Sequence, residues 1–361
     1  MINQLSLLQF RNFPSAQVAF DANCNIFYGE NGQGKTNLLE AIYLLSTGRS
    51  FRSVRDSEMI RFNEPSAVVQ AIWTEENNTK QLEMRLFEQS GKQYWINQVK
   101  ERPFRSCFQT VLFTPGDMQI IQSSPSERRK FIDQTLCQMR PRYAKAFSEY
   151  TKILEHKQKI LKSEDPSLLS TLDVFTERLA GCGAVLIPYR AAFTEVLEQE
   201  ANSLHREISG DREQLRFTYQ TVRTITNPHA SESELFEQLM RHASELKEAE
   251  IASKSCLSGI HKDDLFIQIN DREAKLYASR GQTRTAVLAM KLAVRELFRK
   301  DTGSYPIMLL DDVLGELDER RRAFLLEHIR GAQTFLTVCE QQEFVSGTRY
   351  RVSEGTVVRQ D

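Results

Sequence analysis

The segment "GENGQGKT", at Gly29 to Thr36, constrains the fold of this chain more strongly than any other. It fits the pattern G-x-x-x-x-G-K-[ST] at every fixed position, and it follows a strand-like run and opens a helix-like one. In that context glycines let backbone N–H groups curl around a phosphate, and the helix dipole adds positive potential. The sequence therefore predicts a phosphate-binding loop with these members: Gly29, Glu30, Asn31, Gly32, Gln33, Gly34, Lys35 and Thr36.

A second motif, "IMLLDD", supplies the acids that such a loop requires, because a predicted strand ends in Asp311 and Asp312. Two adjacent carboxylates repel each other, and a metal ion beside them relieves that repulsion. We expect Lys35 to contact the β- and γ-phosphates of a nucleotide. Thr36 and Asp311 would hold Mg²⁺, and Asp312 would orient and deprotonate the attacking water. A chance glycine turn or a strand ending in solvated acids would each explain only one of the two motifs.

Composition narrows the class of protein. With 361 residues, 40% of them apolar, the chain can form two or perhaps three domains. Apolar runs are broken by Lys or Arg before ~18 residues, and the N-terminus resembles a strand, so neither a membrane span nor a signal peptide is expected. Six scattered cysteines without a C-x-x-C pair indicate reduced thiols in a cytoplasmic protein. The net charge of −1 means that nucleic-acid binding would need a local patch.

Strand-like and helix-like segments alternate at both ends of the sequence, and the middle is helical and rich in charged residues. The middle begins at "SPSERRKFIDQTL", where Ser124 is the expected N-cap, Pro125 the first helical residue and Glu127 the partner in a capping box. Its heptads are not sustained, which excludes a long coiled coil. We predict the class α/β, with an ABC-type ATPase head (a P-loop sheet and a strand-rich lobe) interrupted by a mostly helical domain. The segments are the head at 1–122, the helical insertion at 123–255 and the rest of the head at 256–361.

A second phosphate-facing turn, "SRGQTR", opens another apolar-patterned helix at Ser279 to Arg284. It has small residues and hydroxyls but no lysine. We infer that Ser279 and the Gly281 backbone complete a site that begins on a partner's phosphate-binding loop, with a helix N-terminus near Gln282 adding favourable potential. The turn therefore predicts that the protein works as a nucleotide-dependent homodimer.

The order of these motifs resembles the ABC/SMC ATPase heads and, more narrowly, the RecF family of bacterial DNA repair ATPases. The matching segments run through nearly the whole chain: "LLQFRNF", "YGENGQGKTNLLEAIYLLSTGRSFR", "SPSERRKFID", "SGIHKDDL", "SRGQTRTAVLAMKLA", "LLDDVLGELDERRR" and "QTFLTV". The resemblance implies ATP and Mg²⁺ as ligands, and an ATP-dependent homodimer on double-stranded DNA near single-strand junctions. It also implies partnership with RecR and RecO in loading RecA onto gapped DNA.

By the same resemblance, Ser279, Gly281 and Gln282 form the signature turn, and Asp318 belongs to a dimer-crossing loop. The bottom-up interpretation of Asp318 is a helix N-cap, which does not conflict with that role. Arg11 and Asn12 in "QFRNF" are expected near the nucleotide on the resemblance alone.

Four departures from the family pattern bear on mechanism. Arg280 stands where transporter-type signatures have glycine. The acid beside the water is Asp312, one methylene shorter than the usual Glu, which favours slow hydrolysis suited to a switch. "FLTVCE" has no His at the γ-phosphate-sensing position, and Thr337 is the nearest polar residue in the sequence. "FTPGDM" carries Gly116 where an acid is expected, so no Q-loop is assigned.

DNA-contacting residues are less evident. One candidate patch lies in "GRSFRSVRDSEMIR" and comprises Arg49, Arg52, Arg55 and Arg61. An ordinary solvated face explains this patch equally well. A second basic group, Lys152, Lys157, Lys159 and Lys162, alternates with glutamates, which favours a solvated helix.

"SGIHKDDL" contains His261, Asp263 and Asp264, for which we favour a structural role over a metal site. Two other functional classes remain open: a nucleotide-binding subunit of an ABC transporter, and an ABC-headed nuclease. The missing sensor His, Arg280 and the long insertion argue against a transporter. A nuclease would need an appended domain with clustered acids, and the sequence shows none after the final strand. The leading hypothesis is a weak, DNA-stimulated ATPase that acts as a switch.

Overall fold

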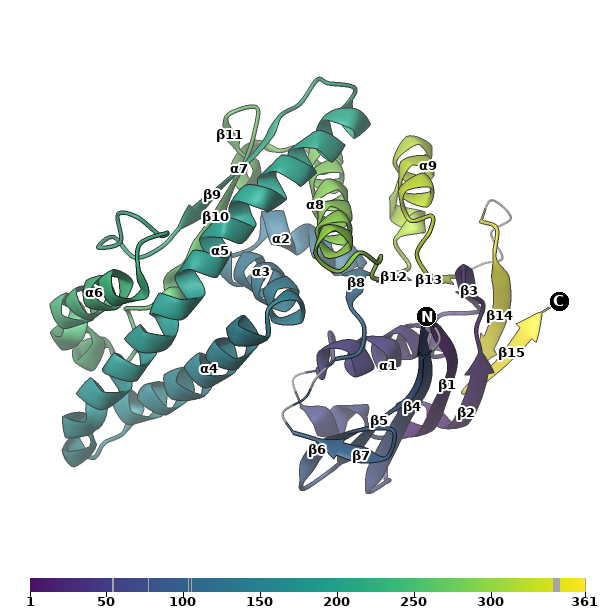
Figure 1. The fold of residues 1–361 in the computed structure, drawn as a ribbon, viewed down its shortest axis with the longest axis horizontal. Coiled ribbons are helices and arrows are strands. Elements are labelled where there is room, and N and C mark those ends of the chain that lie inside the picture. The colour runs from purple at the N-terminus through teal and green to yellow at the C-terminus, as the bar shows by residue number, and fades with distance from the viewer. Residues whose placement is uncertain (54, 77, 103, 105, 340–344, 361) are drawn as a thin grey trace. The chain divides into compact units, whose positions relative to one another are not determined.

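The computed structural model describes residues 1–361 apart from 54, 77, 103, 105, 340–344 and 361. The chain forms two compact units (Figure 1): unit 1 comprises Met1–Asp117 and Phe298–Asp361, and unit 2 comprises Met118–Leu297. The predicted insertion ends at residue 255, whereas unit 2 continues to Leu297 and includes the signature turn. The physical reason is a short sheet in which a strand from the helical middle pairs with strands that follow it.

The first sheet of unit 1 is antiparallel, with the strand order β2-β1-β4-β5-β6-β7. Its strands are β1 (Ile2–Phe10), β2 (Phe13–Ala19), β4 (Ser66–Glu75), β5 (Asn78–Phe87), β6 (Gly91–Ile96) and β7 (Val99–Glu101). Along β4, Ala67, Val69, Ala71 and Trp73 are buried while their neighbours are partly exposed. This period of two is typical of a sheet that packs one face on a core.

The second sheet of unit 1 is mixed, with the order β15-β14-β3-β13-β12-β8 and only β15 antiparallel to its neighbour. Its strands are β3 (Cys24–Tyr28), β8 (Thr110–Phe113), β12 (Ile307–Asp311), β13 (Thr334–Val338), β14 (Thr348–Ser353) and β15 (Thr356–Gln360). Every residue of β12 and β13 is buried, as expected for central strands of a parallel sheet. The helices are α1 (Lys35–Thr47), η1 (Asp56–Met59), η5 (Leu314–Glu316) and α9 (Glu319–His328).

Helix α1 lies in the core that joins the two sheets of unit 1. Its apolar residues Leu38, Leu39, Ile42 and Leu45 follow helical spacing and are all fully buried. They belong to one cluster with residues of both sheets, including Val69, Leu82, Leu309 and Phe335. Each such side chain stabilises the fold by about 1.5–3 kcal/mol through burial. The packing fixes the N-terminus of α1, and with it the loop that precedes the helix.

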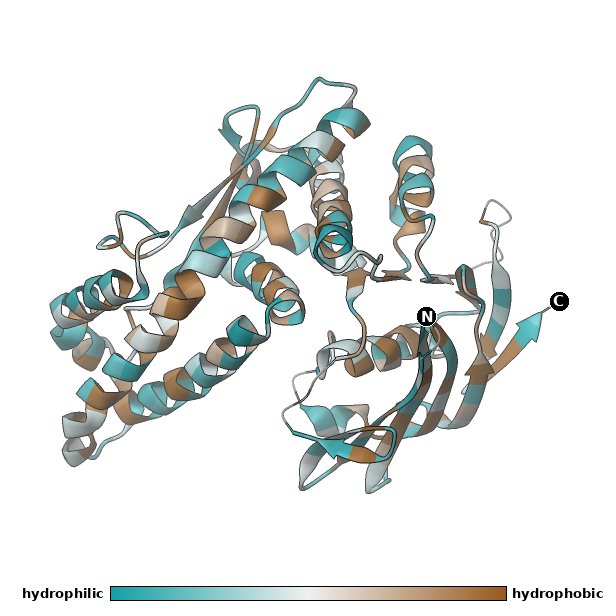
Figure 2. Cartoon of the chain, viewed as in Figure 1, coloured by the Kyte–Doolittle hydropathy of each residue, from teal (hydrophilic) through white to brown (hydrophobic). Residues whose placement is uncertain are grey.

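Unit 2 consists mainly of helices, with a small antiparallel sheet of order β11-β10-β9. Figure 2 shows apolar residues alternating with polar ones along α4 and α5, a pattern typical of helices that bury one face. The strands are β9 (Leu215–Gln220), β10 (Asp264–Ile269) and β11 (Arg272–Glu273). The helices are α2 (Gln119–Gln122), α3 (Pro125–Met139), α4 (Pro141–Lys162), η3 (Pro166–Thr171), α5 (Leu172–Ser209), α6 (Glu232–Ser253), η4 (Ile260–Lys262) and α7 (Ala274–Tyr277). Two elements cross the unit boundaries: η2 (Pro115–Met118) and α8 (Arg280–Thr302).

The N-terminus of α3 differs from its prediction in one detail. Ser124 is the N-cap and Pro125 the first helical residue, as expected, but the capping box is wrong. The Ser124 hydroxyl is hydrogen-bonded to the Ser126 hydroxyl instead (2.6 Å), because a neighbouring serine competes for it. A complete capping box with serine and glutamate occurs at α6, between Ser231 and Glu234.

A buried ionic cluster holds α3, α5 and the segment before β10 together within unit 2. The Arg190 guanidinium, 2% exposed, donates to Asp133 (2.8 Å), to Asp263 (2.7 Å) and to the Ile260 carbonyl (2.8 Å). Tyr219 and Thr221 also donate to Asp263, at 2.5 and 2.8 Å. Burial raises the pKa of Asp263, and the Arg190 charge opposes that shift. The structural role expected for Asp263 is therefore confirmed.

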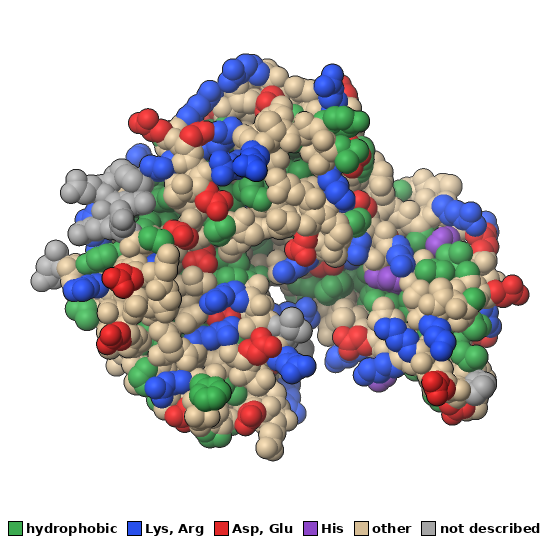
Figure 3. All heavy atoms as spheres, turned by 180° about the vertical axis from the view of Figure 1, so that it is seen from behind, with side chains coloured by type: hydrophobic (Ala, Val, Ile, Leu, Met, Phe, Trp, Pro, Cys, Tyr) green, Lys and Arg blue, Asp and Glu red, His purple; other side chains and the backbone are tan. Residues whose placement is uncertain are grey.

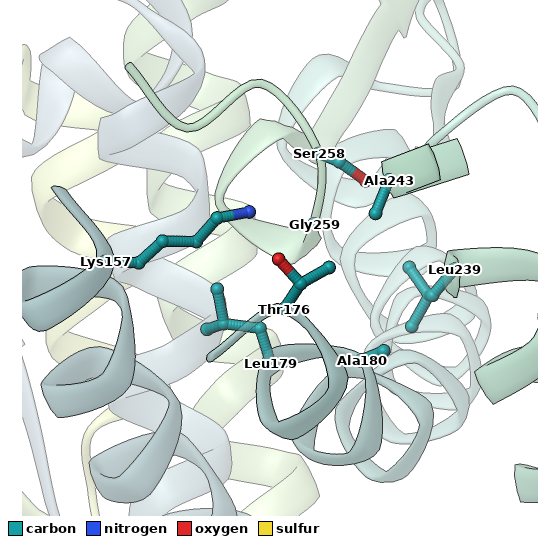
Figure 4. A pocket seen from close by; sticks show the side chains of 8 residues that line it. All are labelled: Lys157, Thr176, Leu179, Ala180, Leu239, Ala243, Ser258 and Gly259. Atoms are coloured by element: carbon teal, nitrogen blue, oxygen red, sulfur yellow. The ribbon is translucent and has the colours of Figure 1, made fainter. Parts of the chain in front are cut away.

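A second buried ion pair joins α4 to α6. Lys157 donates to Glu250 at 2.6 Å, and Glu250 also accepts the backbone N–H groups of Leu257 (2.7 Å) and Ser258 (3.1 Å). A pocket of about 10 Å³ adjoins Lys157 (Figure 4), close to the size of one water molecule. The residues that line it are Lys157, Thr176, Leu179, Ala180, Leu239, Ala243, Ser258 and Gly259. The pair and its pocket are structural, and Lys157 is removed from the candidate DNA contacts because it is buried.

His261 is partly buried, and its surroundings favour the neutral form. Its Nδ1 lies 2.7 Å from the Tyr150 hydroxyl, and its Nε2 donates to the Cys256 carbonyl at 3.1 Å. Tyr150 also accepts the His261 backbone N–H (3.4 Å), so its hydroxyl proton is directed to Nδ1. Burial lowers the pKa of His261 from 6.5 to about 4. Among the described residues, no group of three or more His, Cys, Asp or Glu side chains could hold a metal ion.

This depressed pKa gives a measurable pH dependence. Between pH 6.5 and 4 the unfolded chain binds a proton at His261 that the folded chain does not, so folding stability falls as pH falls. We expect His261→Gln to reduce the loss of unfolding free energy across this window by roughly 3 kcal/mol relative to the unmodified protein. Urea unfolding at several pH values measures the difference, and parallel pH profiles for both proteins would contradict it.

Candidate nucleotide-binding site

The phosphate-binding loop connects β3 to α1 and depends on glycines at two crowded positions. Gly34 is the N-cap of α1 with φ 111°, and a Cβ there would lie 2.6 Å from the Asn12 side chain. Gly29 has φ 149°, and a Cβ there would lie 2.3 Å from the Val352 carbonyl oxygen. Only glycine fits both constraints. The backbone of the loop is therefore fixed by its surroundings.

Lys35 folds back onto this loop. Its side chain is largely buried, and Nζ donates to the carbonyl oxygens of Gly29 (2.5 Å) and Glu30 (2.8 Å). An ammonium group has three donors, so one remains for a phosphate oxygen after these two contacts. The lysine is thus held against the loop at the position where the motif predicts a phosphate contact.

Thr36 and Asp311 are brought together from opposite ends of the chain. The Thr36 hydroxyl donates to Asp311 Oδ1 at 2.8 Å, and the Thr337 hydroxyl donates to the same oxygen at 2.8 Å. Burial raises the pKa of Asp311, and these two hydrogen bonds oppose the shift. A hydroxyl and a carboxylate at one point form an oxygen donor set of the type that Mg²⁺ takes. The residues therefore fit the predicted metal.

Asp312 is held by its backbone. Its N–H donates to the Thr337 hydroxyl at 2.9 Å, and its φ of 53° lies in the left-handed region that is uncommon for aspartate. Cys339 Sγ lies 3.6 Å from both carboxylate oxygens and 3.0 Å from Asn31 Oδ1 of the loop. Thr337 was predicted at this position, whereas a contact of Cys339 with Asp312 was not. The parallel pairing of β3 and β13 explains this contact. Tyr28 pairs with Val338, so the next residue, Cys339, lies beside the loop that follows β3.

Arg11 and Asn12 support the loop from outside. The Asn12 side chain donates to the Gln33 carbonyl (2.8 Å) and accepts from Asn37 of α1 (2.8 Å). Arg11 forms an ion pair (2.6 Å) with Glu40, whose side chain is fully buried in α1. Glu40 was also missed, because its position in an apolar helical run resembles a solvated residue. Both predicted residues thus contact the loop or its helix.

Asp318 and the signature turn each lie at a helix N-terminus. Asp318 is confirmed as an N-cap, since its side chain accepts the Arg321 N–H of α9 at 2.9 Å. At the signature turn, α8 begins at Arg280, two residues before the expected start near Gln282. Ser279 Oγ accepts the Gln282 N–H (3.2 Å), and the Ser279 N–H donates to Gln282 Oε1 (2.8 Å). These two contacts make a capping box of the S-x-x-Q type. The loop and both acids belong to unit 1, and this turn belongs to unit 2.

Comparisons of fold and sequence define the class of this protein as an ATPase head of the RecF/SMC type. Residues 1–357 match the family described as "RecF/RecN/SMC N terminal domain". The SMC head bound to the C-winged helix domain of ScpA has a similar fold, with a TM-score of 0.56 at 16% identity, over all of this chain and 97% of that one. The chain belongs to the RecF family of DNA replication and repair proteins.

Two relatives illustrate the match. The RecF of Ruminiclostridium cellulolyticum is 37% identical over 95% of this chain and 94% of its own length. The RecF of Bacillus subtilis is 34% identical over 99% and 100%, respectively. A structure described as RecF-ATPrS, a recombination mediator protein in the RecFOR pathway, has a TM-score of 0.92 at 31% identity and covers 100% of this chain and 98% of that one. A second, RecF-ATP, has a TM-score of 0.89 at 31% identity and covers 100% and 97%.

No helix in the described part of the chain is both long and apolar enough to cross a membrane.

Figure 3 shows one face of the molecule, on which basic and acidic side chains are interspersed. Of the four candidate arginines, Arg52 donates to Asn37 of α1 (2.8 Å), and Arg61 is close to Glu64 (3.9 Å). Arg52 of the candidate group is therefore in contact with α1.

Proposed function

We propose that this protein is an ATP-dependent DNA-binding switch of recombinational repair and replication restart. ATP binding drives two copies together on double-stranded DNA near single-strand gaps, and slow hydrolysis releases them. The dimer assists RecR, with RecO, in loading RecA in the cytoplasm. The observation that carries this proposal is the hydrogen-bonded group of Thr36, Asp311, Thr337 and Asp312 beside the phosphate-binding loop. RecF structures described with ATP support the choice of nucleotide.

In this proposal the loop binds the nucleotide before any chemistry occurs. Backbone N–H groups of residues 29–36 and the N-terminus of α1 face the phosphates, and Lys35 supplies a third, charged donor. Thr36 and Asp311 would hold Mg²⁺, which neutralises phosphate charge when bound. Asp312 then orients the water that attacks the γ-phosphate and accepts its proton.

The proposal of slow hydrolysis rests on the conformation of Asp312. Its short side chain starts from a left-handed backbone that Thr337 holds in place, so its carboxylate has little freedom to reach toward a water. The partner's Ser279 would complete the γ-phosphate site from the other copy. A hydroxyl that accepts the Gln282 N–H can still donate its own proton, so the capping contact does not exclude this role.

Asp312→Asn is expected to lower ATP hydrolysis by about 100-fold or more, because a positioned general base contributes that much. ATP affinity should stay nearly unchanged, since the substitution leaves Lys35 and the loop backbone unaltered. The variant should therefore accumulate as an ATP-bound dimer, which sedimentation in ATP would measure. Asp56→Asn, which removes a surface carboxylate paired with Lys92, is the control. A monomeric Asp312→Asn protein at saturating ATP would contradict the assignment.

DNA binding itself is tested with blunt and gapped duplexes, with and without ATP, across a salt series. We expect tighter binding to gapped duplex in ATP. We also expect the logarithm of the affinity to fall linearly with the logarithm of the salt concentration, because phosphate contacts release counterions. Binding that is independent of both ATP and salt would exclude the proposed switch. Cleavage of DNA in Mg²⁺ would instead support the nuclease alternative, and ATPase activity that responds only to membrane components would support the transporter alternative.

A further inference from the structure

The signature turn is held in place by more than its own capping box. Gln282, whose Oε1 accepts the Ser279 N–H, uses its Nε2 to donate to Glu213 Oε1 at 2.9 Å. Glu213 lies 69 positions earlier, in the connection between α5 and β9. The side chain that orients Ser279 is therefore itself oriented by a carboxylate from a distant part of unit 2.

Glu213 is in turn anchored to a buried group. Its second oxygen, Oε2, lies 3.1 Å from His205 Nε2, and His205 of α5 is fully buried. The Glu213 side chain is 21% exposed, so solvent weakens these contacts only in part. A carboxylate can accept from both neighbours at once, one on each oxygen. The contacts thus run in series from α5 through Glu213 to Gln282 and Ser279.

The backbone around Glu213 is fixed independently of these side chains. Asn202 of α5 accepts the Leu215 N–H (2.9 Å), and Glu198 of α5 accepts the Phe217 N–H (2.6 Å). On the other side, Gln214 and Asn270 exchange hydrogen bonds of 2.8 and 2.9 Å that tie the connection to the end of β10. Glu213 therefore projects from a rigid support, and its contact with Gln282 can determine where the signature turn sits.

We propose that Glu213 is a positioning residue for the signature turn, which orients Ser279 toward a partner's nucleotide by holding Gln282. This inference rests on the proposed function, since it assumes that Ser279 completes the partner's site. Without the Glu213 carboxylate, Gln282 loses a charge-assisted hydrogen bond and its side chain gains rotational freedom. The capping box then samples other geometries, and the turn must be ordered again when two copies associate.

The test compares ATP-driven dimerisation with ATP binding by the monomer. In Glu213→Ala we expect the dimer dissociation constant in ATP to rise by about 10-fold, the effect of losing one hydrogen bond to a charged group. Monomer affinity for ATP should be unchanged, because Glu213 belongs to unit 2 and the phosphate-binding loop to unit 1. Glu213→Gln should recover most of the dimerisation, since its amide oxygen can still accept from Gln282.

Two further variants make the outcome decisive. Asp211→Ala is the matched control, because it removes a carboxylate two residues away whose partner is the exposed Arg206. Ser279→Arg is the reference for a disabled turn. If Ser279→Arg dimerises normally, the proposed trans-capping function fails. If Ser279→Arg is monomeric but Glu213→Ala dimerises like the unmodified protein, or Glu213→Gln is as weak as Glu213→Ala, the positioning role of Glu213 is wrong on its own.

A direct structural readout accompanies these measurements. Amide hydrogen exchange of a peptide covering Ser279 and Gln282 should be faster in Glu213→Ala and close to normal in Glu213→Gln and Asp211→Ala. Faster exchange throughout unit 2 would show general destabilisation and overturn the specific role.

Discussion

Lys35→Ala should weaken ATP binding by about 100-fold, the largest functional effect expected of any single substitution in this chain. Its Nζ is held by the carbonyls of Gly29 and Glu30, so the charge is already in place before the nucleotide arrives. A charge-assisted contact with phosphate is worth roughly 1.5–3 kcal/mol, and the truncation also leaves two loop carbonyls without their donor. Titration with a fluorescent ATP analogue measures the loss.

The matched control is Lys92→Ala, which removes a lysine of unit 1 whose partner is Asp56 on a partly exposed surface. It should bind ATP with normal affinity. Thermal unfolding of both variants separates a local effect at the loop from a loss of fold. If Lys35→Ala binds ATP within about 3-fold of the unmodified protein, the assignment of the phosphate-binding loop is untenable.

Arg190→Ala is expected to have the largest effect on stability, about 3–5 kcal/mol. The substitution leaves Asp133 and Asp263 buried without their shared cation, and it also removes the hydrogen bond to the Ile260 carbonyl. Uncompensated buried charge costs more than the net value of the pair, because desolvation is no longer offset by attraction. Urea unfolding measured by circular dichroism gives the free energy directly, provided that unit 2 produces a resolved transition.

Arg178→Ala provides a comparison on the same helix. Arg178 pairs with Glu149 at 3.0 Å, but the two side chains are 55% and 47% exposed. An exposed ion pair contributes about 0–1 kcal/mol, so this variant should unfold close to the unmodified protein. Equal destabilisation by the two substitutions would mean that burial does not determine the strength of the Arg190 cluster.

The sequence was sufficient for features that are local or that follow from a motif. Gly34, Lys35 and Thr36 lie where the loop pattern predicts, and Asp311 meets Thr36 although 275 positions separate them. This contact was predictable because the carboxyl ends of parallel strands share one edge of a sheet. The phosphate-binding loop and the acidic pair each occur at the carboxyl end of a predicted strand. The apolar face of α1 was predictable from helical spacing.

Other features depend on contacts that no local pattern encodes. Glu213 lies in an ordinary charged stretch, and only the fold places it against Gln282. Cys339 was predicted only to be a reduced thiol, yet it lies beside Asp312. Unit 2 extends beyond the predicted end of the insertion, and its β9 pairs with β10 through a long-range contact that alternation alone cannot reveal. The predicted Ser124 capping box is absent because the hydroxyl of Ser126, two residues further on, competes for the Ser124 hydroxyl.

The strand order of the mixed sheet has a consequence for how the protein is made. Strand β3, which leads into the phosphate-binding loop, pairs with β13 and β14, and β8 pairs with β12. All three partners follow unit 2 in the chain, so a ribosome must synthesise residues 118–297 before the sheet can close. At 5–20 residues per second this takes roughly 10–40 s. The nucleotide site is thus among the last parts of the nascent protein to form, and a chain released early would lack it altogether.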